Sequence, residues 1–290
     1  MSRATILLTG ATGQLGYELQ SALAPHGEIV ACRRGELDVS DAAAIAATVR
    51  ALRPQIIVNA AAYTAVDRAE SDAAAAQAIN ATAPEVFAGE ARRLGATLIH
   101  FSTDYVFDGS ATAPYTEQAT PRPISVYGRS KLDGELAIES SGCVHLIFRT
   151  SWVYGQRGGN FLLTMQRLAR ERDELRIVDD QIGVPNWSRD LAAAIAKLVA
   201  GGTASLTERS GLYHLSARGP TSWFGFARAI VGDVARPRVV PISTAAYPTP
   251  ARRPAYGVLA TEKFENAFGF ALGDWRDALR RCLSSQRSAA

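Results

Sequence analysis

Two side chains near the middle of the sequence have the types and the spacing of a proton-transfer pair. Tyr127 and Lys131 lie four residues apart in a segment expected to be helical, so they share one face of that helix. A phenol can protonate an oxygen that gains charge, but its ordinary pKa of about 10 is high for use near neutral pH. An ammonium group about 4 Å away contributes up to about 4 kcal/mol at an effective dielectric constant of about 20. We therefore expect Lys131 to lower the pKa of Tyr127 by about two to three units, with a smaller contribution from the helix dipole.

A hydroxyl group completes this arrangement. Thr103 follows the apolar residues 97–102, which are typical of a strand, and so belongs at the carboxyl edge of a sheet, where open α/β sheets bind ligands. There its hydroxyl can donate to the same developing oxyanion. A tyrosine and a lysine at this spacing also occur by chance on exposed helices. Together the three side chains predict reduction of a carbonyl group, with hydride going to carbon and a proton to oxygen.

Glycines near the N-terminus suggest the hydride donor. Gly10, Gly13 and Gly16 are spaced three apart after the apolar residues 6–8, and a helical pattern follows. They would permit a sharp turn, close approach of a pyrophosphate, and close packing of the helix on the sheet, respectively. The helix N-terminus would then offer free N–H groups to the anion. The same glycines also suit a strand-to-helix turn that holds no ligand.

The residues after the second expected strand indicate the type of dinucleotide. Arg33 and Arg34 directly follow residues 29–32, near the position where an acidic residue selects NAD and an arginine accommodates a 2′-phosphate. Guanidinium groups suit phosphate, so we predict NADPH, with NADH as an open alternative. Two solvated loop arginines are the competing interpretation. Asp38 is a candidate for the adenine edge or, alternatively, for capping a turn.

Short apolar segments alternate with longer amphipathic ones through the first half of the chain. This alternation predicts an α/β fold, a Rossmann-like doubly wound parallel sheet. Residues 1–150 would form the NAD(P)-binding domain, and residues 151–290 would mainly form a smaller C-terminal substrate-binding domain, with later segments free to return to the sheet. The expected strands cover residues 4–9, 29–32, 56–59, 97–102, 144–150 and 212–215, and the expected helices cover residues 14–23, 41–52, 73–94 with a break near Pro84, 125–139, 160–172, 188–199, 222–234 and 274–283.

Composition and charge argue against several classes of protein. A formal net charge of +3 without a block of Lys and Arg gives no reason to expect nucleic acid. No apolar run approaches the roughly 18 residues of a membrane-spanning helix, and the start of the chain lacks the pattern of a signal peptide. Cys32, Cys143 and Cys282 are far apart, and the histidines lack the spacing of ligands, so neither disulfides nor a metal site are predicted. We expect a cytoplasmic protein.

Several motifs resemble those of the extended short-chain dehydrogenase/reductases, and more narrowly those of the dTDP-4-dehydrorhamnose reductases. The resemblance runs nearly from end to end. Residues 9–16 and 127–131 are generic to the superfamily, whereas four further motifs in this order are specific to the narrower group. These four are Ile-Val-Asn-Ala-Ala-Ala-Tyr-Thr-Ala-Val-Asp at 57–67, Ser-Thr-Asp-Tyr-Val-Phe at 102–107, Phe-Arg-Thr-Ser-Trp-Val-Tyr at 148–154 and Pro-Thr-Pro-Ala-Arg-Arg-Pro at 248–254.

The resemblance implies a role for individual residues. Thr103, Tyr127 and Lys131 would be catalytic, and Lys131 would also hold the nicotinamide ribose. The cofactor would contact Gly13, Gln14 and Leu15 at its pyrophosphate, Asp38 and Val39 at its adenine, and Ala62, Tyr63 and Thr64 along its backbone. The substrate would contact Asp104, Trp152, Arg252 and Arg253, with a core aromatic as the alternative for Trp152 and exposed loop residues as the alternative for the arginines.

The implied reaction converts dTDP-4-dehydro-L-rhamnose (dTDP-6-deoxy-L-lyxo-4-hexulose) to dTDP-L-rhamnose. Two alternatives stay open: a reductase or epimerase of another nucleotide-linked keto sugar, and a non-catalytic NADP-binding regulatory subunit like that of methionine adenosyltransferase. Some members of the group bind Mg²⁺ through glutamates at a contact in a homodimer. Glu18 matches one such position, but the second falls near Arg189, so we do not extend the metal or that dimer to this chain.

Overall fold

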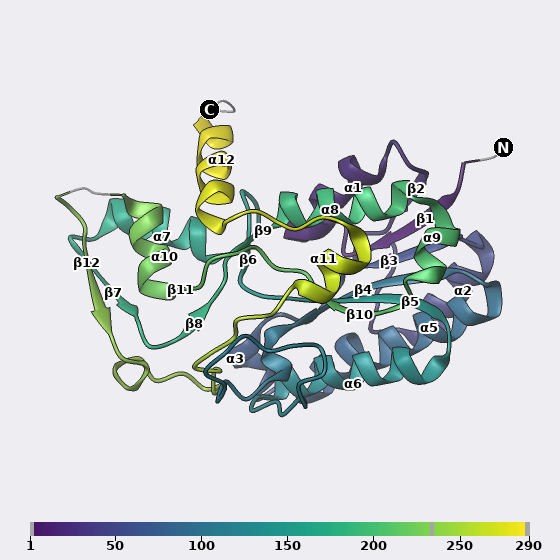
Figure 1. Cartoon of the computed structure of the whole chain (residues 1–290). Helices are drawn as coiled ribbons and strands as arrows, with labels where there is room; N and C mark the ends of the chain where they lie inside the picture. The colour runs from purple at the N-terminus through teal and green to yellow at the C-terminus, as the bar shows by residue number, and fades with distance from the viewer. Residues whose placement is uncertain (1–2, 233–234, 288–290) are drawn as a thin grey trace.

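Six of the apolar segments form one parallel sheet, seen on the right of Figure 1 in a computed structural model that describes residues 3–232 and 235–287. The order of its strands is β10-β5-β4-β3-β1-β2, and every neighbouring pair is parallel. This confirms the predicted α/β architecture. The strands are β1 (Thr5–Thr9), β2 (Glu28–Ala31), β3 (Ile56–Asn59), β4 (Thr97–Thr103), β5 (Val144–Thr150) and β10 (Gly211–His214).

Helices cover both faces of this sheet (Figure 1). Each face has its own apolar core: one core includes Leu19, Ile195 and Phe264, and the other includes Ile45 and Phe87. The first face is covered by α1 (Gln14–Leu23), α8 (Ser188–Ala200), α9 (Gly202–Glu208) and α11 (Glu262–Phe268), and the second by α2 (Ala42–Leu52), α5 (Ala83–Leu94) and α6 (Val126–Ser141).

The sheet is completed by residues far along the chain. Strand β10 pairs with β5, with Tyr213 opposite Phe148, and α8 packs against α1. Residues beyond 150 therefore supply one edge of the sheet and much of the cover of one face.

A smaller lobe lies beside the sheet, on the left of Figure 1. Its core surrounds the fully buried side chains of Tyr154, Phe226 and Trp275. Its elements are β6 (Val153–Tyr154), α7 (Phe161–Glu171), β7 (Glu174–Val178), β8 (Ile182–Gly183), β9 (Asn186–Trp187), β11 (Thr221–Ser222), α10 (Trp223–Val231), β12 (Arg238–Ile242) and α12 (Trp275–Arg287). The helix expected over residues 222–234 ends at Val231, and its last expected residues lie outside the described part of the chain.

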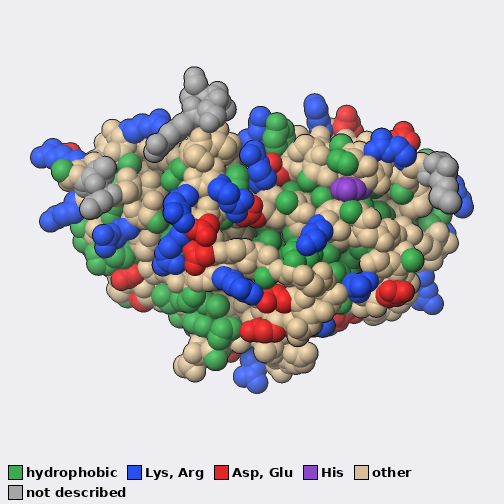
Figure 2. Space-filling view, turned by 45° about the horizontal axis from the view of Figure 1, so that its top comes forward, with side chains coloured by type: hydrophobic (Ala, Val, Ile, Leu, Met, Phe, Trp, Pro, Cys, Tyr) green, Lys and Arg blue, Asp and Glu red, His purple; other side chains and the backbone are tan. Residues whose placement is uncertain are grey.

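Charged side chains of both signs are interspersed over the face in Figure 2. Many charged side chains of the protein are paired, as in the contacts of Arg189 with Glu18 and of Arg281 with Asp190. Within residues 3–232 and 235–287, no helix combines the length and the apolar character needed to span a membrane.

The long helix expected over residues 73–94 is divided into three parts. After α3 (Val66–Ala69), the chain forms α4 (Ala73–Gln77), the π-helical turn η1 (Ala78–Thr82) and then α5. Pro84 lies just after the π-helical turn, and because it has no N–H to donate to a carbonyl of the preceding turn, the irregular part precedes it. The π-turn brings the Asn80 carbonyl against Gly134 of α6, where an added Cβ would be 2.1 Å from the oxygen.

This contact predicts a large difference between two glycine-to-alanine substitutions. Gly134→Ala should lower the free energy of unfolding by about 1–3 kcal/mol, because the new methyl group would overlap backbone. Gly89→Ala on the exposed face of α5 has nothing within 4 Å of the new Cβ. It should raise the stability by about 0.5–1 kcal/mol. Urea denaturation of the two variants checks both signs, and equal stabilities would contradict the close contact.

Candidate active site

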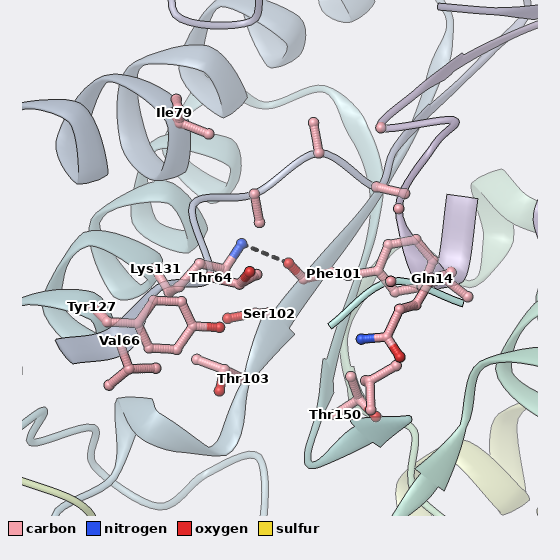
Figure 3. Close-up of a pocket in the computed structure, with 18 of the residues that line it drawn as sticks. Gln14, Thr64, Val66, Ile79, Phe101, Ser102, Thr103, Tyr127, Lys131 and Thr150 are labelled. Atoms are coloured by element: carbon pink, nitrogen blue, oxygen red, sulfur yellow. Dashed lines mark hydrogen bonds between the residues drawn. The ribbon is translucent and has the colours of Figure 1, made fainter. Parts of the chain in front are cut away.

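A cavity of about 660 Å³ opens at the carboxyl edge of the large sheet. Its lining comes from both the sheet and the smaller lobe, and Figure 3 shows Thr103, Tyr127 and Lys131 together at one end, with Gln14 and Thr150 across from them. Most of the site residues predicted from the sequence lie in this lining: Gly10, Gly13, Gln14, Leu15, Asp38, Val39, Ala62, Thr64, Thr103, Asp104, Tyr127, Lys131 and Trp152.

Three predicted cofactor residues lie outside the lining. Gly16 is beneath the turn, where an added Cβ would be 2.0 Å from the Gly10 carbonyl oxygen, so its contribution is close packing. The Tyr63 hydroxyl donates to Asp72. Arg33 is exposed, and its neighbour Arg34 is the arginine that lines the cavity.

The two predicted substrate arginines also lie outside the lining. The Arg253 guanidinium donates to both carboxylate oxygens of Asp67, at 3.0 and 2.7 Å, and to the Thr249 hydroxyl. Arg252 is exposed. The structure thus engages Arg253 in holding the loop of residues 249–253 onto α3.

The N-terminus of α1 has the character of an anion site. No side chain caps it, and its first turn contains no acidic residue, so N–H groups of Gln14, Leu15 and Gly16 are available to a ligand. By contrast, side chains cap α2, α6, α7 and α10. Buried oxygens of Gln14, Ser102 and Thr150 also face this cavity without a hydrogen-bond partner. These features fit a dinucleotide.

The environment of Tyr127 corrects the electrostatic prediction. Desolvation in the cavity raises the pKa of Tyr127 to about 12, opposed by the neighbouring Thr103 hydroxyl and reinforced by the Asp104 carboxylate. The expected depression by Lys131 is wrong for this structure. The phenol is therefore protonated at neutral pH, the form required of a proton donor.

Lys131 shares the cavity end with Tyr127 but is hydrogen-bonded elsewhere. Its Nζ donates to the Phe101 carbonyl oxygen at 2.7 Å, the dashed line in Figure 3, and lies 3.1 Å from His100 Nε2. The side chain is 2% exposed, and burial lowers its pKa to about 8, with Glu135 acting in the opposite direction. Spacing along α6 could not reveal these two contacts because both partners belong to β4.

Trp152 forms one wall of the cavity with a residue that the sequence did not point to. Its ring stacks on Trp223, with ring centroids 3.6 Å apart and planes 10° from parallel. An added Cβ on Gly183 would be 2.6 Å from the Trp152 ring, so that position must be small. Trp152 itself has φ 42°, a left-handed conformation that costs a non-glycine residue energy.

Residues 4–288 match the family model described as RmlD substrate binding domain. The dTDP-4-dehydrorhamnose reductase of Burkholderia thailandensis is 47% identical, over 96% of this chain and 97% of the relative. The corresponding reductase of Escherichia coli K12 is 46% identical, over 96% and 97%. The chain belongs to the dTDP-4-dehydrorhamnose reductase family. This confirms the predicted family and its oxidoreductase class over the two alternatives.

A solved structure of the family has the same fold. The dTDP-4-dehydrorhamnose reductase of Bacillus anthracis, in complex with NADP, is 37% identical and matches with a TM-score of 0.91, covering 98% of this chain and 100% of that one. A UDP-glucose 4-epimerase of Thermus thermophilus matches with a TM-score of 0.79 at 18% identity, a likeness in fold alone.

The structure pairs Glu18, which the resemblance matches to a magnesium ligand, with a basic residue. Glu18 accepts a hydrogen bond from Arg189 Nε at 3.0 Å, and Asp190 is bound through both oxygens by Arg281. A guanidinium group thus occupies the place of a cation at Glu18. The described residues contain no group of three or more His, Cys, Asp or Glu that could hold a metal.

Some lining residues were not recognised from the sequence. Thr150 ends β5 and Ser151 follows it, at the same edge as Thr103, so a search of every strand end would have found them. Gly158, Gly159 and Asn160 precede α7 in the smaller lobe, and only the folded chain brings them to the cavity. Cation–π contact also holds this loop, with Arg157 3.8 Å from the Tyr17 ring of α1.

Asp104 is the buried carboxylate of the site. It is 3% exposed and accepts a hydrogen bond from the Thr103 hydroxyl at 3.1 Å, and burial raises its pKa to about 7. The folded state therefore binds the Asp104 proton more tightly than the unfolded state does. The contribution of this group to stability is lost as pH rises from about 4 to 7.

Asp104→Asn removes the titrating carboxyl group, so the loss of stability with rising pH should disappear. The variant should be more stable than the parent chain by about 1–3 kcal/mol at pH 8, and the difference should vanish near pH 4. Urea denaturation at both pH values measures it. Asp108→Asn is the control of opposite sign, since hydrogen bonds from Ser110 lower the pKa of Asp108. A stability difference for Asp104→Asn that does not change with pH would contradict the buried carboxylate.

Proposed function

We propose that this chain reduces the C4 keto group of dTDP-4-dehydro-L-rhamnose with NADPH, giving dTDP-L-rhamnose. The observation that carries the proposal is the meeting of Thr103, Tyr127 and Lys131 at one end of a cavity whose other side is the uncapped N-terminus of α1. The first 150 residues, together with later segments that join the sheet, would hold the cofactor. The smaller lobe within residues 151–290 would contribute to the substrate site.

The cofactor would lie along the sheet edge. The N–H groups of the first turn of α1 would bind its pyrophosphate, Asp38 and Val39 its adenine end, and Ala62 and Thr64 its middle. Arg34, which lines the cavity, would bind the 2′-phosphate. Support comes from the Bacillus anthracis relative, whose structure is a complex with NADP.

NADPH supplies a hydride that forms the new C4–H bond as the carbonyl π electrons move to O4. Tyr127 would donate its phenolic proton to O4, and the Thr103 hydroxyl would donate a hydrogen bond to the same oxygen. The phenolate left on Tyr127 then recovers a proton from solvent. Desolvation, which raises the pKa of Tyr127, keeps the proton on the phenol until negative charge develops beside it.

The sugar nucleotide would be recognised from both sides of the cavity. The stacked rings of Trp152 and Trp223 offer an apolar wall, and Asp104 offers a carboxyl group beside the catalytic hydroxyl. Arg252 is exposed outside the cavity lining, and Arg253, also outside it, is held in an ion pair with Asp67. Turnover of dTDP- and UDP-linked keto sugars in parallel would distinguish the proposed substrate from other nucleotide sugars.

Removal of the phenolic hydroxyl tests the proton donor. Tyr127→Phe should lower kcat by about 10²–10⁴-fold, because it removes the proposed proton donor, while NADPH binding persists. Oxidation of NADPH, followed by absorbance with the dTDP-keto sugar, measures the loss. Tyr154→Phe removes a different buried hydroxyl, in the core of the smaller lobe, and should leave kcat within about twofold. Normal turnover by Tyr127→Phe would contradict the proposed mechanism.

The adjacent arginines provide a matched pair for cofactor preference. Arg34→Ala should weaken NADPH by about tenfold or more and leave NADH nearly unchanged, since it would remove a charge-assisted contact with the 2′-phosphate. Arg33→Ala should have the smaller effect because Arg33 lies outside the cavity lining. Titration of each variant with both dinucleotides measures the Kd values. A larger loss in Arg33→Ala would assign the phosphate to Arg33 instead.

A further inference from the structure

A chain of buried polar side chains leads from β1 through β3 and β4 to Lys131. The Thr9 hydroxyl donates to Asn59 Oδ1 at 2.7 Å, Asn59 Nδ2 lies 3.2 Å from His100 Nδ1, and His100 Nε2 lies 3.1 Å from Lys131 Nζ. None of the four side chains is more than 2% exposed. Such a chain constrains which hydrogen atom each group carries, since a buried polar atom must face a complementary partner.

The amide of Asn59 has a defined orientation. Its Oδ1 faces two groups, the Thr9 hydroxyl and the backbone N–H of Ala61 at 3.3 Å. A backbone N–H can only donate, so exchanging the amide oxygen and nitrogen would set two donors against each other. Asn59 Nδ2 therefore faces His100 and donates a hydrogen bond to it.

This orientation determines the tautomer of His100. Because Asn59 Nδ2 donates, His100 Nδ1 accepts, and the ring proton is on Nε2. A doubly protonated ring would place Nδ1–H against the amide N–H. Burial and the nearby Lys131 lower the pKa of His100 well below its usual value, so the ring is neutral. The Nε2–H consequently points at Lys131.

Lys131 is thus presented with one donor and one acceptor. An ammonium group can only donate, whereas a neutral amine has a lone pair that can accept from His100 Nε2–H. The Phe101 carbonyl, at 2.7 Å, can accept an N–H from either form. The contact with His100 therefore favours the amine, in agreement with the burial that lowers the pKa of Lys131 to about 8.

We infer that Thr9, Asn59 and His100 form a positioning chain that controls the charge of Lys131, with His100 donating to Nζ from its Nε2–H and favouring the neutral amine. The effect on catalysis rests on the proposed function. Lys131 would be an ammonium at lower pH and an uncharged amine at higher pH, so the positive charge that it brings to the end of the cavity where the substrate oxyanion develops would diminish as pH rises.

Other charged groups near this end of the cavity do not have the effect on Lys131 that the positioning chain has. Glu135, one turn further along α6, favours the charged form of Lys131 but is bound at 2.9 and 2.6 Å by the buried Arg149. Asp104 acts on Tyr127 from the end of β4. Of the described residues that act on Lys131, His100 is the one that presents a donor to Nζ.

Nuclear magnetic resonance of the cofactor-free protein tests the chain without any assay of activity. The sequence contains four histidines, so the two-bond ¹H–¹⁵N pattern of His100 can be assigned with His100→Gln. We expect a neutral ring protonated at Nε2 from pH 6 to 9. A ring protonated at Nδ1, or at both nitrogens, would overturn the inference regardless of which substrate the enzyme converts.

The titration of Lys131 provides the second arm. Lys131, Lys197 and Lys263 are the lysines of the chain, which makes ¹³C-labelled lysine spectra simple to assign. In His100→Gln the amide oxygen can accept from an ammonium, so the titration midpoint of Lys131 should rise by about one pH unit, a tenfold change in proton affinity. An unchanged midpoint would contradict the inference.

Two further variants separate this role from a structural one. His214→Gln alters another buried histidine, held by the Ala260 carbonyl, and should leave the midpoint of Lys131 unchanged. Thr9→Val removes one of the two donors at Asn59 Oδ1, so the Nδ1–H tautomer of His100 should become detectable even if His100→Gln does not fold.

If the positioning chain of Thr9, Asn59 and His100 also serves catalysis, the alkaline limb of the pH profile of kcat/KM should shift to higher pH in His100→Gln, by as much as the titration midpoint of Lys131 does. Absence of turnover in the parent chain would refute the proposed function and leave both spectroscopic arms intact.

Discussion

The approach of helix α1 to the carbonyl of Gly10 is the constraint on which the site depends. An added Cβ on Gly16 would be 2.0 Å from that oxygen, and one on Gly10 would be 2.6 Å from the backbone of Ala60. With side chains absent at both positions, the first turn of α1 begins directly above the ends of β1 and β3. The free N–H groups of the helix therefore reach the same edge at which β4 and β5 end, and one cavity can join an anion site to a proton donor.

Burial defines the electrostatics of the other end of the cavity. Desolvation raises the pKa of both Tyr127 and Asp104 and lowers that of Lys131, so each group moves towards its neutral form. A water-excluding site of this kind suits a reaction in which charge appears only transiently on the substrate oxygen. The same burial requires that polar groups find partners within the protein. The side chains that contact Lys131 from the sheet, His100 and through it Asn59, therefore have defined hydrogen-bonding roles.

Local sequence patterns predicted most of the fold and most of the residues that line the cavity. Apolar runs and helical periodicity are local properties, and Thr103 could be placed because a strand end is a predictable location. The environment of Lys131 could not be predicted, since Phe101 and His100 contact its Nζ from another element. The distinction between Arg33 and Arg34 depends on the direction of a loop, and Trp223 reaches Trp152 only through packing of the smaller lobe.

The return of β10 and α8 to the large sheet has a consequence for synthesis on the ribosome. Strand β5 has an unpaired edge, and α1 has an uncovered flank, until residues 188–214 have emerged. The nascent N-terminal half therefore exposes an unpaired parallel strand during this interval, a kind of surface that can pair with other chains. Completion of one half of the molecule depends on translation of the other.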